Sequence, residues 1–204
     1  MAIKTRELTP GQWPAFERLF GPRGACGGCW CMAWRVERGG KLWEETQGEP
    51  ARCMMRALVR GRKAHGVLAF EGSEPVGWCS LGPRAHFPRL ERTRAYRRED
   101  TEGVWSINCF FIPRERRGQG LSRVLLQAAI AACRHHGAAV VEGYPATLTR
   151  RGQRLPAAFA WMGPLAIFEQ AGFREVQRLS PSRPLVRLEL SAGRPRARRV
   201  RRTS

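Results

Sequence analysis

The chain has 204 residues, a hydrophobic fraction of 43% and a formal net charge of +19. This length suits one compact domain, and no segment approaches the roughly 20 consecutive apolar residues of a transmembrane helix, so we expect no membrane partner. Because the N-terminus also lacks the apolar run of a secretion signal, we expect a cytoplasmic protein whose seven cysteines are reduced thiols.

The first hundred residues alternate between predicted strands and helices. Apolar periodicity and turn residues predict, in chain order, a strand over residues 2–8, a helix from Pro10 to Phe20, a helix over 49–62, and strands over 66–70 and 75–81. The charged stretch that follows, residues 82–103, is expected to be irregular, with a short helix near Phe87–Leu90.

The second half opens with Val104–Ile112 (VWSINCFFI), whose nearly unbroken apolar run is typical of a strand covered on both faces. The pattern then predicts, in chain order, a helix from Leu121 to His136 closed by Gly137, a strand over 138–141, a long loop over 146–162, a helix over 164–171, and strands over 173–178 and 185–190. We therefore expect one mixed α/β domain over residues 1–190.

The last segment, residues 191–204, carries six arginines and no acid, which predicts a basic, disordered tail. One interpretation is an electrostatic grip on nucleic acid. The other is a solvated tail in an arginine-rich chain. We favour the second, because no aromatic residues alternate with the basic ones and no base-reading motif accompanies them.

A glycine turn, Arg116–Ser122 (RRGQGLS), lies between the buried strand and the first turn of the following helix. Glycines let a ligand approach the backbone closely, and a helix start leaves amide N–H groups unpaired. With the helix dipole and nearby arginines, these features predict a phosphate-binding loop. The loop lacks the Lys-Ser/Thr of a P-loop, and Arg123 stands where a dinucleotide fingerprint needs its third glycine.

The pattern Arg-x-x-Gly-x-Gly/Ala at Arg117–Ser122 resembles the coenzyme A pyrophosphate loop of the GCN5-related N-acetyltransferase (GNAT) superfamily. Residues 166–173 (AIFEQAGF) are similar to that family's late helix and turn, so the likeness spans residues 3–190. It implies an α/β (α+β) fold: a single mixed, mostly antiparallel, twisted sheet of about seven strands, flanked by about four helices and splayed between strands four and five. Homodimers are common on this fold, so a homodimer is one expected assembly.

The resemblance also implies an activity: an acyl-CoA-dependent N-acyltransferase. Its donor would be acetyl-CoA, and its acceptor a primary amine of a small molecule or a protein, attacking directly in a ternary complex. Coenzyme binding is assigned by the resemblance to the strand end, the glycine loop and the late helix: Phe110, Phe111, Ile112, Arg116, Arg117, Gly118, Gln119, Gly120, Leu121, Ser122, Arg123 and Phe168. Backbone amides near Phe110 would polarise the acetyl carbonyl. Ser122 stands where the family has glycine or alanine.

Acid–base catalysis is harder to assign, because Phe168 takes the place of the family's usual tyrosine and cannot donate a proton. Glu142, at the end of an apolar strand, is our candidate base, with a salt bridge to an arginine as the alternative. Tyr144 is the candidate acid, with an aromatic residue packed in a loop as the alternative. The thiolate of coenzyme A leaves readily, so no acid is strictly required.

The segment Cys26–Arg35 (CGGCWCMAWR) is expected in the loop where the superfamily shapes its acceptor pocket. Cys26, Cys29 and Cys31 raise the alternative of a zinc-dependent sensor, but no second Cys-x-x-Cys follows, so we expect no metal. His135 and His136 are read as structural, because adjacent helical side chains diverge by about 100°. The candidate substrate-binding residues, each with core packing as its alternative, are Trp30, Trp34, Arg35, Ser106 and Asn108.

Overall fold

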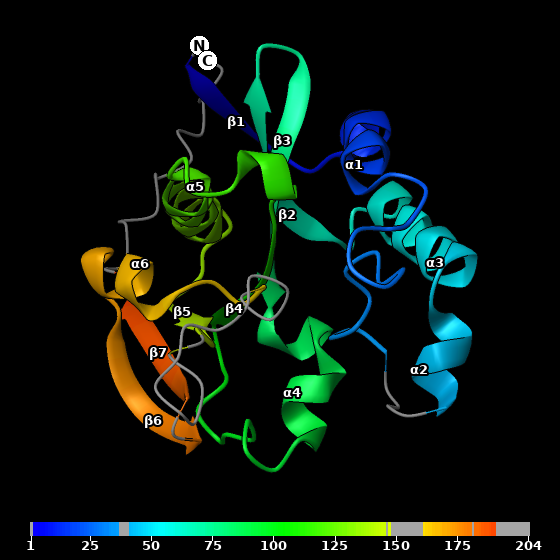
Figure 1. Ribbon diagram of the computed structural model, residues 1–204. Coiled ribbons are helices and arrows are strands. Elements are labelled where there is room, and N and C mark those ends of the chain that lie inside the picture. Colours follow the sequence, from blue (N-terminus) through cyan, green and yellow to red (C-terminus); the bar gives the residue numbers. More distant parts are fainter. Residues whose placement is uncertain (1, 37–40, 146, 148–160, 181, 191–204) are drawn as a thin grey trace, which may run out of the picture.

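The protein was analysed as a computed structural model, which describes residues 2–36, 41–145, 147, 161–180 and 182–190 (Figure 1). The predicted basic tail at 191–204 and almost all of the predicted loop over 146–162 lie outside these residues. The domain boundary at residue 190 therefore stays a prediction. Within the described ranges, no helix is long and apolar enough to cross a lipid bilayer.

Seven strands and six α-helices make up the regular structure of these residues. The strands are β1 (Ile3–Glu7), β2 (His65–Glu71), β3 (Glu74–Pro83), β4 (Val104–Phe111), β5 (Val140–Gly143), β6 (Arg174–Ser180) and β7 (Arg183–Glu189). The helices are α1 (Trp13–Phe20), α2 (Lys41–Thr46), α3 (Glu49–Arg60), α4 (Pro88–Arg92), α5 (Leu121–His135) and α6 (Leu165–Gln170). Short 3-10 turns are η1 (Pro10–Gln12), η2 (Arg84–His86) and η3 (Arg114–Arg116).

All seven strands form one sheet in the order β1-β2-β3-β4-β5-β7-β6. Neighbouring strands are antiparallel, with the single exception of β4 and β5, which run parallel. These two pair only from Val104–Val140 to Ile107–Gly143, whereas β4 continues to Phe111. The second half of β4 therefore has no β5 beside it, and this is the expected splay.

A β-bulge marks the place where β4 leaves β5. Ser80 of β3 pairs with Cys109 and Leu81 pairs with Ile107, so Asn108 between them has no partner in β3. A bulge bends its strand and increases the local twist. The bulge lies just before Phe110 and Phe111, in the part of β4 that no longer pairs with β5.

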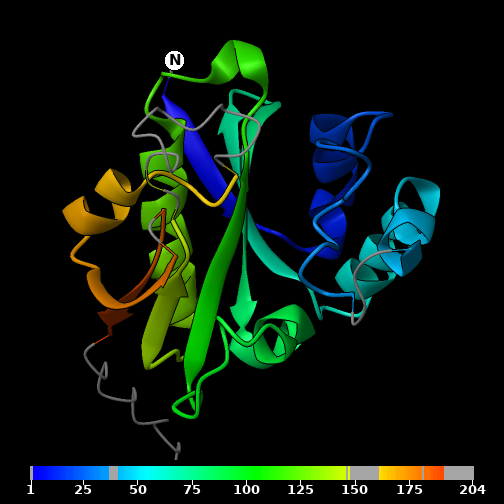
Figure 2. The ribbon, with the colours of Figure 1, turned by 60° about the horizontal axis from the view of Figure 1, so that its bottom comes forward.

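Helices cover both faces of the sheet (Figures 1 and 2). On one face α5 and α6 pack against the apolar side chains of β2, β3 and β4, where the amphipathic pattern of α5 buries Leu125, Leu126 and Ala129. On the other face, α1 and α3 enclose a cluster of aromatic side chains that includes Phe16, Trp30 and Trp78. Both faces of the central strands are covered, as their apolar sequence predicts.

The predicted fold is confirmed, with differences at individual elements. No sequence signal indicated α2, a six-residue helix (KLWEET) that follows Gly40 and precedes α3. The strand predicted over 138–141 begins two residues later, where the Ala139 amide donates to Gly103 in the turn before β4. The short helix predicted near Phe87–Leu90 is α4, and the described α-helices number six where the resemblance implied about four.

Candidate active site

A cavity of about 820 Å³ opens where β4 and β5 separate. Three segments line it: the end of β4, the glycine turn with the start of α5, and the cysteine-rich loop that follows α1. The described lining residues are Phe20, Ala25, Cys26, Cys29, Cys31, Ala33, Trp34, Cys109, Phe110, Phe111, Ile112, Arg116, Arg117, Gly118, Gly120, Leu121, Ser122, Trp161, Gly163 and Pro164. The predicted coenzyme loop and the predicted acceptor loop therefore share one cavity.

The glycine turn presents an open helix N-terminus to this cavity. Gly118 and Gly120 have φ angles of +77° and +76°, a conformation that side chains other than glycine's rarely adopt. A Cβ atom added at either glycine would meet no heavy atom within 4 Å, so the space above the turn is free for a ligand. Gly120 caps α5 without a side-chain hydrogen bond, which leaves the amides of Leu121 and Ser122 available.

Two arginines add positive charge beside this helix start. Arg116 donates to Glu71 over 2.8 Å, and the Nε of Arg117 donates to the carbonyl of Ile112 over 3.0 Å. Both side chains are held in place and line the cavity. Backbone donors, the helix dipole and two guanidinium groups together fit the pyrophosphate of a nucleotide-containing coenzyme.

Three predicted coenzyme-binding residues lie outside the described cavity lining. Arg123 donates to the side chain of Gln170 over 2.6 Å, and the Gln119 amide donates to the carbonyl of Glu115 over 3.3 Å. Phe168 is fully buried and packs edge to face against Phe110, with ring centroids 6.2 Å apart. Its ring fills the space beside Gly143, where an added Cβ atom would lie 2.3 Å from it.

The end of β4 has one of its predicted carbonyl-polarising amides already engaged. The N–H of Phe110 donates to the carbonyl of Trp161 over 2.6 Å, on the side of the strand that β5 has left. Ile112, just past the end of β4, lines the cavity as well. The Phe110 amide can therefore reach a ligand only if Trp161 moves.

Glu142 lies in a closed ion-pair network and not in the cavity. Its fully buried carboxylate accepts from Arg84 over 2.5 Å and from Arg187 over 2.8 and 2.6 Å. Arg187 also pairs with Asp100, whose pKa is held well below its ordinary value by hydrogen bonds from Arg98 and Arg187. The salt bridge that the sequence left open as the alternative is therefore present.

Tyr144 belongs to the same network. Its hydroxyl donates to Glu142 over 2.7 Å, accepts from Arg84 over 2.9 Å and lies 3.0 Å from the Ser106 hydroxyl. Burial, and then the charge of Glu142, raise the pKa of the Tyr144 hydroxyl well above its ordinary value. A hydroxyl so placed is a poor proton donor, and neither Tyr144 nor Ser106 is among the described lining residues.

The acceptor side of the cavity is apolar and aromatic. Trp34 and Trp161 line it with ring centroids 5.8 Å apart, and the Trp34 indole N–H finds no partner among the described residues. Trp30 instead packs in the core against Phe20 at 5.5 Å, and Arg35 lies over the Phe87 ring, with burial lowering its pKa to about 10. Asn108 is buried in the bulge, outside the described lining.

A family model of the GNAT acetyltransferases matches residues 30–146, more than half of the sequence. The chain belongs to the GNAT acetyltransferase family. No protein with a curated description matches it.

Solved structures show the same GNAT fold at low sequence identity. The PaiA N-acetyltransferase of Thermoplasma acidophilum, in complex with coenzyme A, is 13% identical with a TM-score of 0.52, over 93% of this chain and 100% of that one. The Salmonella typhimurium protein yncA, with its cofactor acetyl-CoA, is 14% identical with a TM-score of 0.51, over 94% and 95%. A GCN5-related N-acetyltransferase of Kribbella flavida is 15% identical with a TM-score of 0.54, over 93% and 98%.

The cysteines of this GNAT chain contribute thiols to the cavity wall. Cys26, Cys29, Cys31 and Cys109 line it, and burial raises the pKa of the Cys29 thiol to about 12. Among the described residues these sulfur atoms do not form a group close enough to share one metal ion. Cys109 comes from the apolar run of β4 and lies at the cavity beside the three cysteines of the loop.

Sequence reasoning missed several residues of this GNAT site. Trp161 and Gly163 come from the predicted irregular segment after β5, and Pro164 from the start of the helix predicted to follow it. Phe20 was assigned to a helix face and lines the cavity from the end of α1. No local pattern marks Arg84 or Arg187, because their partner Glu142 is distant in the sequence.

Proposed function

We propose that this protein transfers the acetyl group of acetyl-CoA to a primary amine, by direct attack in a ternary complex within the cavity. One observation carries the proposal: a single cavity joins the open N-terminus of α5 to an aromatic pocket around Trp34 and Trp161. The coenzyme would occupy the first part and the amine the second, so that donor and acceptor meet where β4 leaves β5.

The residues of this chain would bind the coenzyme at two places. The amides of Leu121 and Ser122, with Arg116 and Arg117, would hold the pyrophosphate, and the β4 edge at Ile112 would hold the pantetheine arm. When bound, acetyl-CoA supplies an activated thioester. The acceptor nitrogen attacks the carbonyl carbon, the C–N bond forms as the C–S bond breaks, and the proton lost by nitrogen balances the one gained by the thiolate.

The acceptor that best fits the pocket is an apolar amine that is uncharged at neutral pH. The described lining holds no carboxylate and no imidazole, the side chains that most often take a proton from an ammonium group. A weakly basic aromatic amine needs no such base, and its ring would pack against Trp34 and Trp161.

The test compares an aromatic amine with an alkylamine of similar size, with the acetylated product measured by mass spectrometry. We expect kcat/KM for the aromatic amine to be higher and flat between about pH 6 and 9. For the alkylamine it should rise roughly tenfold per pH unit, because only the free base reacts. Trp34→Leu should lower kcat/KM for the aromatic amine and leave acetyl-CoA affinity unchanged.

The outcomes separate the parts of the proposal. A folded protein that does not bind acetyl-CoA would contradict the transferase itself. Binding of acetyl-CoA without acetylation of either amine would contradict the acceptor class alone, as would a preference for the alkylamine.

A further inference from the structure

All four histidines of the sequence meet at one end of the fold, outside the described cavity lining. His65 begins β2, His86 lies in η2, and His135 and His136 end α5. The His65 ring centroid lies 6.1 Å from that of His86 and 5.1 Å from that of His136, and the rings of His135 and His136 are 5.0 Å apart. Imidazole is the side chain most often used to bind transition metals.

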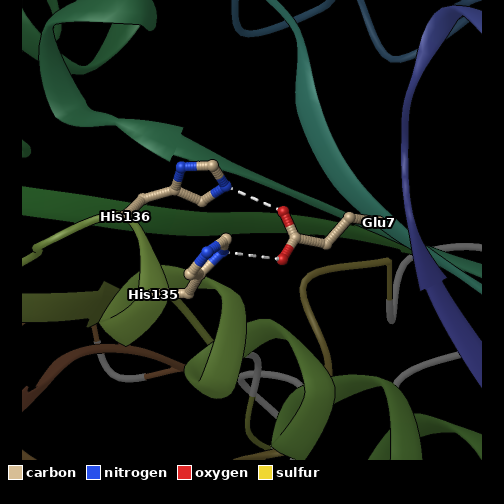
Figure 3. Close-up of side chains that lie close together, drawn as sticks. All are labelled: Glu7, His135 and His136. Carbon is tan, nitrogen blue, oxygen red and sulfur yellow. Dashed lines mark hydrogen bonds and ion pairs between the residues drawn. The ribbon is translucent and has the colours of Figure 1, made fainter.

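A carboxylate completes a set of three ligand atoms within this cluster (Figure 3). The last residue of β1, Glu7, places one carboxylate oxygen 3.4 Å from Nδ1 of His135 and the other 2.7 Å from Nε2 of His136. All three ligand atoms lie within 4.8 Å of one another. Zinc binds nitrogen and oxygen ligands at about 2.0–2.2 Å, so an ion between them needs only small side-chain movements.

The end of α5 explains why two adjacent histidines can point to one place. Within a helix their side chains would diverge by about 100°, which is why the sequence suggested a poor chelating pair. The helix ends at His135, and His136 has φ −85° and ψ 6°, after which Gly137 turns the chain with φ +79°. At this helix end both imidazoles reach Glu7, one on each carboxylate oxygen, so the divergence expected within a helix does not separate them.

The groups around the two histidines favour a bound cation and hold the His136 ring in place. The negative end of the α5 dipole lies at His135 and His136. The His136 ring stacks on Trp105, with centroids 5.2 Å apart and 14° between the planes, and His65 packs against it edge-on. The His135 side chain is 74% exposed, so an ion can enter from solvent.

We propose that Glu7, His135 and His136 form a binding site for a divalent first-row transition ion such as Zn²⁺, with water at the remaining position. Imidazole and carboxylate ligands suit these ions. The site joins β1 to the end of α5, two elements far apart in the chain, so a bound ion would stabilise the folded state. It is independent of the proposed acetyl transfer.

Calorimetric titration of Zn²⁺ into untagged, chelator-treated protein tests this site. We expect one ion per chain and a rise in melting temperature with added Zn²⁺. Glu7→Gln and His135→Ala should each weaken binding by at least about tenfold, since even outer partners of a ligand are worth that much. The matched control is His86→Gln, which alters the same cluster without removing a ligand and should bind like the parent.

Absorption spectra with Co²⁺ identify the ligands, because seven free cysteines offer competing sites. The proposal predicts no thiolate-to-cobalt charge-transfer band from the first equivalent. Absence of binding by the parent would overturn it. Binding that survives both Glu7→Gln and His135→Ala, or that shows the thiolate band, would overturn it equally.

Discussion

Replacing Ser122 by glutamate puts a carboxylate in the first turn of α5, beside the amides that we expect to hold the coenzyme's pyrophosphate. At about 6 Å and an effective dielectric constant near 20, two unit charges repel by roughly 3 kcal/mol. Solvent screening reduces this to about 1.5–2.5 kcal/mol, and 1.4 kcal/mol corresponds to a factor of ten in affinity. Ser122→Glu should therefore weaken acetyl-CoA binding by about ten- to a hundredfold.

The same substitution should leave the fold intact, because a negative charge in the first turn of a helix is stabilising by about 0.3–1 kcal/mol. Calorimetry gives the affinity, and a melting curve without ligand gives the stability. Ser122→Ala should bind within about threefold of the parent. Gln127→Glu, exposed further along α5, controls for the added charge. Unchanged affinity in Ser122→Glu would refute the placement of the pyrophosphate at this helix start.

Three further substitutions test the packing and the ion pairs around the splay. Glu142→Gln should lower the free energy of unfolding in urea by about 3–5 kcal/mol, because it removes the buried charge that pairs with both Arg84 and Arg187; a catalytic base would instead lower kcat with stability unchanged. Gly143→Ala should lower the free energy of unfolding by about 1–3 kcal/mol, since its Cβ would lie 2.3 Å from the Phe168 ring. Adding Phe168→Leu to this variant should recover part of the lost stability. Losses that simply add would argue against this contact. Asp100→Asn should reduce the loss of folding stability that occurs as the pH falls below about 4. The carboxyl of Asp100 has a lowered pKa in the folded state, so the unfolded chain takes up its proton first as the pH falls. An unchanged dependence of stability on pH in this acid range would contradict the prediction.

The fold was predictable because its signals are local. The apolar run of β4, the glycine turn and the amphipathic α5 each determine their own element, and the turn's positive φ angles require glycine at 118 and 120. The same residues carry the predicted coenzyme side of the site. Of the two predicted tryptophans in the acceptor loop, Trp34 lies at the cavity and Trp30 packs in the core, and the residue type alone could not separate these two uses.

The missing parts of the site depend on contacts between distant segments. Glu142 is paired by Arg84 and Arg187, and no spacing in the sequence connects them. The bulge at Asn108 arises from its register with β3, and the His135–Glu7 contact from the packing of α5 beside β1. Residue type predicted the chemistry of each group, whereas its partner was set by tertiary structure.

Amide hydrogen exchange with and without acetyl-CoA reports where on the chain the coenzyme binds. We expect slower exchange for the amides of Ile112 and of the glycine turn through Ser122, with the ends of β1 and α5 near Glu7 unchanged. Protection elsewhere, or no protection at saturating acetyl-CoA, would contradict it.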